Sequence, residues 1–380
     1  MKKVQQMISA VIFLAVLFGL MFSSLLLPKK SVSETENRTL AEMPQLTAAG
    51  VKDKSYMDGV ETYAADHFVL RDQWVAVKSA AELAAGKKEI GGVYITDERL
   101  IGKLTEDDVD EVRLKQSIDG VRAFAQNTET PVAMLLAPTA AEVYSDTLPA
   151  YAPNLDQQQL ISRVADDLRG DVTMINVYNS LYAMRNEYIY YRTDHHWTSY
   201  GAFLAYQTAI KKLGFSPVSY EMYNIEHAAD DFRGTLYSKS LYRGIEPDMI
   251  DLYHYNGTDP VTSVTINDGL NETEYPSIYF WDFLNTSEKY SVFLGRNAAM
   301  VTVRTKVKND KKLLLIKDSY ANSMLPFLTE HYSEIVLLDM RYVRGDYHAY
   351  VDPDQFSQVL VLYNVSNFAT DGNIKLLAAQ

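Results

Sequence analysis

The sequence contains no cysteine and shows no excess of basic residues. Without cysteine the chain has no disulfides, no thiolate metal ligands and no cysteine nucleophile. The formal net charge of -13 argues against a nucleic-acid partner, because phosphate binding needs a basic surface. Hydrophobic residues make up 47% of the 380 residues, which is ordinary for a globular protein long enough for one large domain or two smaller ones.

Long apolar runs are also scarce, with a single exception near the N-terminus. Lys2 and Lys3 precede an uncharged apolar run from Met7 to Leu27. At about 1.5 Å per residue this run can cross a hydrocarbon core of roughly 30 Å. It exceeds the usual signal-peptide core of roughly 7–15 residues, and no clear small-x-small cleavage site follows. We expect residues 1–30 to be a single-pass membrane anchor, or alternatively a signal peptide, with the rest of the chain outside the cytoplasm.

The chain beyond the anchor divides by pattern. Residues 31–90 predict a polar stalk followed by a helical segment. Residues 91–380 alternate between short apolar runs and helical periodicity, apart from a stretch at about 215–310 that is rich in Tyr, Asn and β-like runs. That stretch predicts a β-rich insertion or a small subdomain.

Repeated strand–helix units predict an α/β domain. The expected strands are 131–137, 172–177, 312–316, 334–339 and 359–363, and the expected helices are 107–126, 156–169, 199–213 and 319–331. Such alternation is typical of a mostly parallel sheet covered by helices on both faces. The sequence therefore predicts a three-layer α/β/α domain over residues 91–380.

A first polar motif, Thr193-Asp194-His195-His196-Trp197, offers a carboxylate and an imidazole two positions apart. A short aromatic strand at 188–192 is expected to lead into it, and Thr198 or Ser199 can cap the helix that follows. This arrangement predicts a strand-to-helix loop, where sites form in open α/β sheets. Asp194 can then orient the ring of His196, although a purely structural role for the pair stays open.

A second motif, Lys317-Asp318-Ser319-Tyr320, follows the apolar run of the strand at 312–316. A serine at a strand-to-helix turn lies near backbone N–H groups that can stabilise an oxyanion. A serine hydroxyl needs a base, and the base needs an orienting group. Ser319, His196 and Asp194 can fill these roles as nucleophile, base and orienter, whereas a simple helix cap is the alternative for Ser319.

Further residues are weaker candidates for this site. Asn364 and Asn297 could supply side-chain amides to an oxyanion hole, although Asn is also a common turn former. His195 and Trp197 are candidates for substrate contact or packing. The doublet His195-His196 suggests a metal, but adjacent side chains point in different directions and the other histidines lack ligand spacing. We expect neither a metal nor a cofactor.

These residues resemble the DHHW protein family, named for the tetrad that stands here at 194–197. The other matching segments are Glu36-Asn37-Arg38, Phe68-Val69-Leu70-Arg71, Gly92-Val93-Tyr94, Asp231-Phe232-Arg233-Gly234 and Lys317-Asp318-Ser319-Tyr320-Ala321-Asn322-Ser323. The chain is also similar to the SGNH-hydrolase-like domains of alginate O-acetylation proteins, which carry an Asp-x-His-Trp motif before a Gly-Asp-Ser motif. Lys317 replaces that glycine here. Ordinary SGNH hydrolases have the serine first, so the resemblance implies a circularly permuted motif order.

The resemblance also implies an activity. It suggests transfer of an acyl group, with acetyl expected, through an acyl-Ser319 intermediate to hydroxyls of a cell-surface or secreted polysaccharide. The acyl donor would come from a partner such as a membrane-bound acyltransferase. Two alternatives stay open: a carbohydrate esterase that uses the same three residues, and a non-catalytic envelope protein that binds glycan through its tyrosine-rich insertion.

Overall fold

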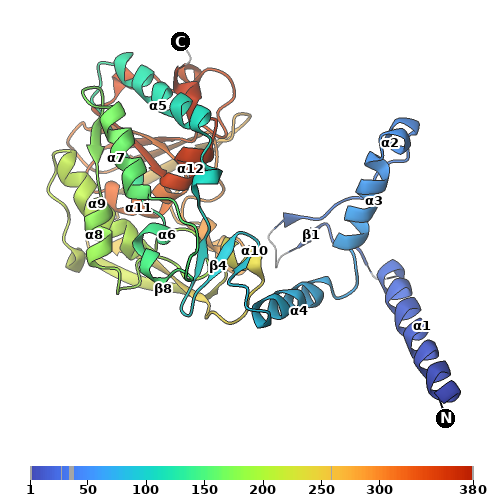
Figure 1. Cartoon of the computed structure of the whole chain (residues 1–380). Helices are drawn as coiled ribbons and strands as arrows, with labels where there is room; N and C mark the ends of the chain where they lie inside the picture. The colour runs from blue at the N-terminus through green and yellow to red at the C-terminus, as the bar shows by residue number, and fades with distance from the viewer. Residues whose placement is uncertain (1, 27, 34–37, 258, 379–380) are drawn as a thin grey trace. The chain divides into compact units, whose positions relative to one another are not determined.

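The computed structural model of the chain describes residues 2–26, 28–33, 38–257 and 259–378. Three residues singled out in the sequence, Leu27, Glu36 and Asn37, lie outside these ranges. The described chain forms two compact units (Figure 1). The first comprises Met1–Ile90 with Tyr237–Arg243, and the second comprises Gly91–Leu236 with Gly244–Gln380.

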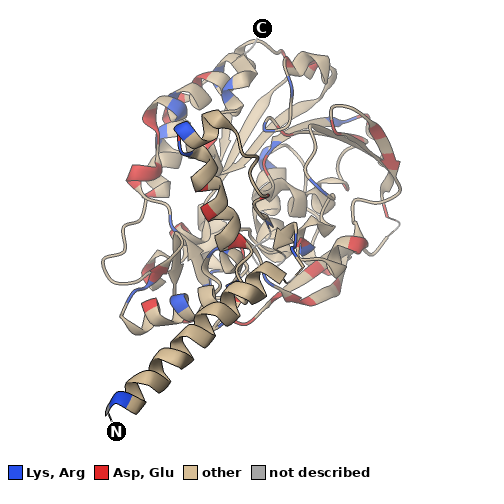
Figure 2. Ribbon diagram, turned by 90° about the vertical axis from the view of Figure 1, so that its right-hand side faces the viewer, with Lys and Arg blue, Asp and Glu red and all other residues tan. Residues whose placement is uncertain are grey.

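The first unit begins with the apolar helix α1, Lys2–Leu26. Within the described chain, Lys3–Leu26 is the one helix whose length and composition suit a membrane span. Figure 2 shows basic residues at its N-terminal end and none along the rest of its length. Such a helix can be an anchor or a signal sequence.

The remainder of the first unit is short strands and helices. They are β1 (Val32–Ser33), β2 (Arg38–Thr39), α2 (Ala48–Lys52), α3 (Ser55–Asp66), α4 (Arg71–Ala84) and β3 (Glu89–Ile90). Asp66, at the end of α3, receives two hydrogen bonds from the Arg38 guanidinium and lies 3.7 Å from Arg71 Nε. The hydrogen bonds from Arg38 lower the pKa of Asp66 to about 2. Arg38 and Arg71, which belong to two segments that resemble the DHHW family, thus both contact one buried carboxylate.

The second unit is built on an eight-stranded sheet in the order β11-β10-β12-β14-β13-β15-β6-β7. Five neighbouring strands are parallel: β14 (Glu334–Leu338), β13 (Lys312–Lys317), β15 (Gln358–Asn364), β6 (Val132–Ala137) and β7 (Thr173–Ile175). The side chains of β14, β13, β15 and β6 are almost entirely buried, as parallel strands covered on both faces require, whereas the edge strand β7 is partly exposed. The sheet is therefore mostly parallel, as the sequence predicted.

Successive side chains of these strands point alternately into two hydrophobic cores, one on each face of the sheet. Ala133 and Leu135 of β6 join the core with α6 (Ala140–Val143), α8 (Tyr178–Ala183), α9 (Ser199–Lys212) and α11 (Tyr320–Leu328). Val132 and Met134 join the core with α5 (Glu111–Gln126), α7 (Gln157–Asp167) and α12 (Val365–Thr370). Helices thus cover both faces, so the second unit has three layers (Figure 1).

Residues 215–310 do not form a separate layer. β10 (Val261–Asn267), β11 (Glu272–Tyr275) and β12 (Met300–Thr305) extend the central sheet antiparallel beyond β14. Within the second unit, two other antiparallel pairs lie outside this sheet: β8 (Tyr223–Phe232) with β9 (Asp248–Tyr255), and β4 (Val93–Ile95) with β5 (Leu100–Gly102). The short helix α10 (Thr235–Ser240) follows β8.

One expected element is absent. The segment 188–192 was predicted as a strand but forms only an isolated bridge between Tyr190 and Trp197. The tetrad therefore lies on a loop between α8 and α9, and not directly after a strand. The Thr198 side chain caps α9 by accepting from the Gly201 N–H at 3.2 Å, as expected.

Candidate active site

Ser319 stands where β13 ends and α11 begins, at the carboxyl edge of the parallel strands. It is half-buried, and its backbone is right-handed, with φ of -68°. Its side chain makes no capping hydrogen bond to α11, which leaves Oγ available for other partners. The capping alternative therefore does not describe this serine.

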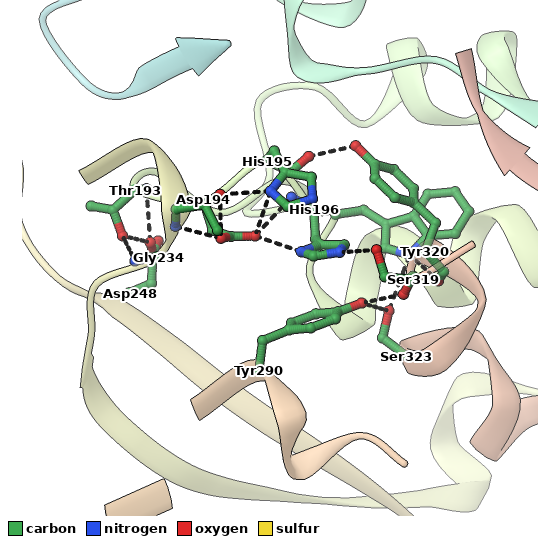
Figure 3. Close-up of polar contacts among 12 residues, drawn as sticks. Thr193, Asp194, His195, His196, Gly234, Asp248, Tyr290, Ser319, Tyr320 and Ser323 are labelled. Atoms are coloured by element: carbon green, nitrogen blue, oxygen red, sulfur yellow. Dashed lines mark hydrogen bonds and ion pairs between the residues drawn. The ribbon is translucent and has the colours of Figure 1, made fainter. Parts of the chain in front are cut away.

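The partner of Ser319 Oγ is His196, across 123 residues of sequence. His196 Nε2 lies 2.7 Å from Ser319 Oγ, and His196 Nδ1 lies 2.6 Å from Asp194 Oδ1 (Figure 3). If Nδ1 carries the proton and donates to the carboxylate, Nε2 is left to accept the serine O–H. The three residues expected from the sequence thus form one continuous hydrogen-bonded chain.

Asp194 is buried, and both of its oxygens are occupied. Oδ1 accepts from the His196 N–H at 3.0 Å, and Oδ2 accepts from the N–H and hydroxyl of Thr235 at 2.8 and 3.1 Å. Burial raises the pKa of Asp194, but the two neighbouring histidines and these donors lower it further, so the net pKa lies below the usual range. A carboxylate held ionised in this way suits the orientation of an imidazole.

The loop that carries Asp194 is itself anchored on a buried carboxylate, Asp248. Its oxygens accept from the backbone N–H groups of Arg192 and Thr193, the Thr193 hydroxyl and the Tyr188 hydroxyl. Burial raises the pKa of Asp248, while these four donors oppose that rise. Asp248 is the first residue of β9, and its donors precede Asp194 in the sequence. These hydrogen bonds therefore hold the segment that leads into the tetrad against the start of β9.

A third buried carboxylate, Asp318, shapes the turn before the serine. It accepts from the backbone N–H groups of Tyr320 and Asn364 at 2.9 and 2.8 Å, and from the side-chain amides of Asn364 and Asn367 at 2.7 and 2.9 Å. Burial raises the pKa of Asp318. The Asn364 amide, considered for an oxyanion hole, is therefore engaged with Asp318, and its oxygen caps α12.

Lys317, which stands before Asp318-Ser319, directs its side chain to polar partners other than the serine hydroxyl. Its buried ammonium donates to Asn322 Oδ1 at 2.9 Å and Asn297 Oδ1 at 3.4 Å, and lies 3.6 Å from Asp339 Oδ2. Burial lowers the pKa of Lys317. Since Asn297 presents its oxygen to Lys317, its amide nitrogen is turned away from that ammonium.

Trp197 and Tyr320 join the two motifs. The fully buried indole of Trp197 donates to the Tyr320 carbonyl and Ser323 Oγ, both at 3.0 Å. The Tyr320 hydroxyl in turn donates to the His195 carbonyl. Through these bonds Trp197 connects the loop that carries the histidines to the first turn of α11.

The side chain of His195 has a different hydrogen-bond partner from that of His196. Its Nδ1 lies 2.7 Å from Thr235 Oγ1, and its ring lies against the His196 ring with centroids 3.9 Å apart. Asp194, His195 and His196 offer ligand atoms within 4.8 Å of one another, a spacing that could hold a metal ion. A metal at Asp194 would compete with the donors that already occupy both carboxylate oxygens.

Several residues at this site were not identified in the sequence. Thr235 completes the donor set of Asp194, and Asp248 anchors its loop. Tyr290, in the short helix η5 (Lys289–Val292), lies flat against His196. Thr235 directly follows residues 231–234, whose resemblance to the DHHW family marked that region. No pattern in the sequence pointed to Tyr290.

Comparison with known structures places this fold among relatives of low identity. A DHHW family protein from Eubacterium siraeum shares 24% identity, with 76% of this chain and 95% of that chain covered and a TM-score of 0.65. Bacillus cereus PatB1 shares 20% identity, with 74% and 98% covered and a TM-score of 0.63, and a second PatB1 structure carries a sulfonyl adduct. The O-acetyltransferase domain of Pseudomonas putida AlgJ matches at 16% identity, with 76% and 99% covered and a TM-score of 0.46.

No curated protein matches the sequence. The DHHW protein family model, in contrast, matches residues 118–338, which is more than half of the chain and includes both Asp194-His195-His196-Trp197 and Ser319. The chain belongs to the DHHW family.

Proposed function

We propose that this protein is a serine-dependent acyltransferase of the cell envelope, with an SGNH-like catalytic domain in permuted motif order. The observation that supports this most directly is the chain Ser319 Oγ–His196–Asp194, with links of 2.7 and 2.6 Å. A nucleophile, a base within hydrogen-bond reach and a carboxylate behind the base together make up the constellation of covalent acyl transfer.

In the first half-reaction His196 Nε2 accepts the Ser319 proton as Oγ attacks the acyl carbonyl. The tetrahedral intermediate collapses, the bond to the donor breaks, and the leaving group takes the proton from His196. In the second half-reaction an acceptor hydroxyl gives its proton to His196 and attacks the acyl-Ser319 ester. The new ester leaves, and Ser319 recovers its proton. Asp194 stabilises the imidazolium in both halves.

The negative charge that develops on the carbonyl oxygen needs donors. The Ser319 N–H makes no hydrogen bond within the described residues and stands at the start of α11, where the helix dipole favours an anion. The side-chain amide of Asn297 is the second donor we propose, since its oxygen is already fixed by Lys317. Asn364 would act indirectly, through Asp318.

The acyl group and the acceptor are proposed from the resemblance to alginate O-acetylation proteins. We assign acetyl as the group and a hydroxyl of a cell-surface or secreted polysaccharide as the acceptor, with a membrane-bound acyltransferase as the acyl donor. Helix α1 would keep the catalytic unit close to the membrane, outside the cytoplasm. Water in place of the sugar hydroxyl would make the same site an esterase.

One experiment tests the nucleophile and the reaction type. The full chain in detergent is incubated with p-nitrophenyl acetate, with and without a soluble oligosaccharide, and products are identified by mass spectrometry. We expect an acetyl group on Ser319 and an acetylated sugar. Acetate alone, in the presence of every acceptor tried, would favour the esterase, and glycan binding without any Ser319 adduct would favour a binding protein.

A further inference from the structure

The ring of Tyr290 lies face to face with the ring of His196. The two centroids are 3.8 Å apart and the planes differ by 8° (Figure 3). One face of the imidazole is therefore in contact with the Tyr290 ring. Because the planes are nearly parallel, tilting the imidazole away from its line between Asp194 and Ser319 would break this stacking contact.

The hydroxyl of Tyr290 reaches the nucleophile's helix at the same time. It lies 3.1 Å from the Ser319 carbonyl oxygen and 3.2 Å from Ser323 Oγ. Burial raises the pKa of the Tyr290 phenol, so the group stays protonated and can donate to the carbonyl. One side chain therefore contacts the base through its ring and the first turn of α11 through its oxygen.

The backbone that carries Tyr290 is held from two directions. Phe280 N–H donates to the Val292 carbonyl, and Leu294 N–H donates to the Ile278 carbonyl, both at 2.8 Å. Leu294 adopts a left-handed conformation, with φ of 70°, which is costly for a branched residue. Leu294 follows η5 by two residues, so the two hydrogen bonds and this conformation flank the helix that carries Tyr290.

We infer that Tyr290 is a positioning residue for the base, and that the segment 215–310 supplies it to a site whose other members come from the two motifs. The inference rests on the proposed function, in which His196 accepts the serine proton. The face of an aromatic ring attracts a cation, so Tyr290 favours the imidazolium that forms during proton transfer and holds the ring in line with Ser319.

Four other residues with polar or ionisable side chains also face His196. Asp194 and His195 face it from its own loop, and Ser319 and Tyr320 face it from the start of α11. None of these four residues is itself altered when Tyr290 alone is replaced.

The test measures the rate at which phenylmethanesulfonyl fluoride labels the full chain in detergent, as a function of pH. In this reaction Ser319 Oγ forms the S–O bond, the S–F bond breaks, fluoride leaves, and the hydroxyl proton passes to His196. Tyr290→Phe keeps the ring and loses the hydroxyl. Tyr290→Leu and Tyr290→Met remove the ring, and Met fills the space flexibly if Leu does not allow folding.

For Tyr290→Phe we expect the midpoint of the pH profile to stay in place. For Tyr290→Leu and Tyr290→Met the midpoint should move about half a pH unit lower, because the imidazolium has lost its cation–π contact. The limiting rate should fall about tenfold. Tyr182→Leu, which removes a ring stacked on Tyr178 at 5.3 Å, is the matched control and should change neither quantity.

Two failures can be told apart. If peptide mass spectrometry finds no label on Ser319 of the unmodified protein, the proposed function is wrong. If Ser319 is labelled but the folded Leu or Met variant keeps the original midpoint, the proposed function stands and Tyr290 only fills space.

Discussion

Gly234 packs so closely on Asp194 that a β-carbon at residue 234 would lie 2.3 Å from the carboxylate oxygen Oδ2. Its own N–H donates to Thr193 Oγ1 at 3.1 Å, and the next residue, Thr235, supplies the donors to Asp194. The backbone just after β8 thus lies directly against Asp194, and only glycine at position 234 leaves room for this contact.

Gly234→Ala should therefore displace Asp194 and with it the ring of His196. A shift of about 1 Å can reduce the rate of a positioned reaction about a hundredfold, and we expect a loss of that order in Ser319 labelling. Gly372→Ala is the matched control, because a β-carbon there meets nothing within 4 Å. Equal labelling rates in the two variants would show that the position of Asp194 does not limit the reaction.

The triad itself predicts non-additive losses. Residues that act as one unit lose nearly the whole effect when any one is removed. Ser319→Ala, His196→Ala and the double variant should have similarly low turnover of an acetyl ester, with unchanged circular dichroism. Turnover near that of the unmodified protein in Ser319→Ala would falsify the nucleophile assignment.

The two adjacent histidines should differ in effect. His196→Gln removes the proposed base and should cost roughly 10²–10⁴-fold in turnover. His195→Gln should cost about tenfold, or about 1.4 kcal/mol of barrier, because its ring contacts Thr235 and lies beside the base. Since Asp194 is saturated by protein donors, a chelator should change neither result. A chelator that abolishes turnover would instead indicate a metal held by Asp194, His195 and His196.

The parallel sheet could be predicted from the sequence because its strands are buried on both faces. Such strands read as continuous apolar runs, as at Leu313–Ile316, and the helices between them show regular periodicity. Ser319 and His196 could be identified for a related reason. Ser319 follows the strand β13 and His196 precedes the helix α9, and a single sequence indicates both of these elements. The strand expected before His196 is absent, so that part of the argument for a common edge was wrong.

Tyr290 could not be found in this way. It stands in a four-residue helix between irregular segments, and its role depends on long-range packing that brings it to His196. Asn364 illustrates a second limit. The sequence indicates that it ends β15, but whether its amide meets Asp318 or an oxyanion depends on side-chain orientation in the folded chain. The positions of these two residues along the chain were visible in the sequence, but their side-chain partners were not.

Two neighbouring residues that follow α11, Glu330 and His331, should affect acid stability in opposite directions. Burial lowers the pKa of His331 to about 4, and its Nε2 lies 2.7 Å from the Tyr206 hydroxyl. The unfolded histidine, with a pKa near 6.5, binds a proton first as pH falls, so stability is lost between about pH 6.5 and pH 4. Burial raises the pKa of Glu330 to about 7, so its contribution is present at low pH and is lost as pH rises from about 4.5 to 7.

His331→Gln should therefore flatten the loss of stability in acid, by about 2 kcal/mol at pH 4.5. Glu330→Gln should steepen it, since the opposing contribution is gone. Urea unfolding of both variants and the unmodified protein at pH 4.5, 5.5 and 6.5 measures the slopes. Parallel pH profiles for all three proteins would mean that neither group titrates differently on folding.

The N-terminal helix gives a prediction about the mature protein. Lys3–Leu26 has the length and composition of a membrane span. Its large apolar side chains are exposed, and such a surface is unfavourable in contact with water. As an anchor it should stay attached, so the mature chain should keep its N-terminus and fractionate with membranes through a high-salt wash. Replacing two central residues of the helix, Phe13→Lys and Leu17→Lys, should release the protein or prevent its export, because charges at mid-membrane are costly. Conversely, a mature chain that starts near residue 30 and is found free in the medium would identify the helix as a cleaved signal sequence.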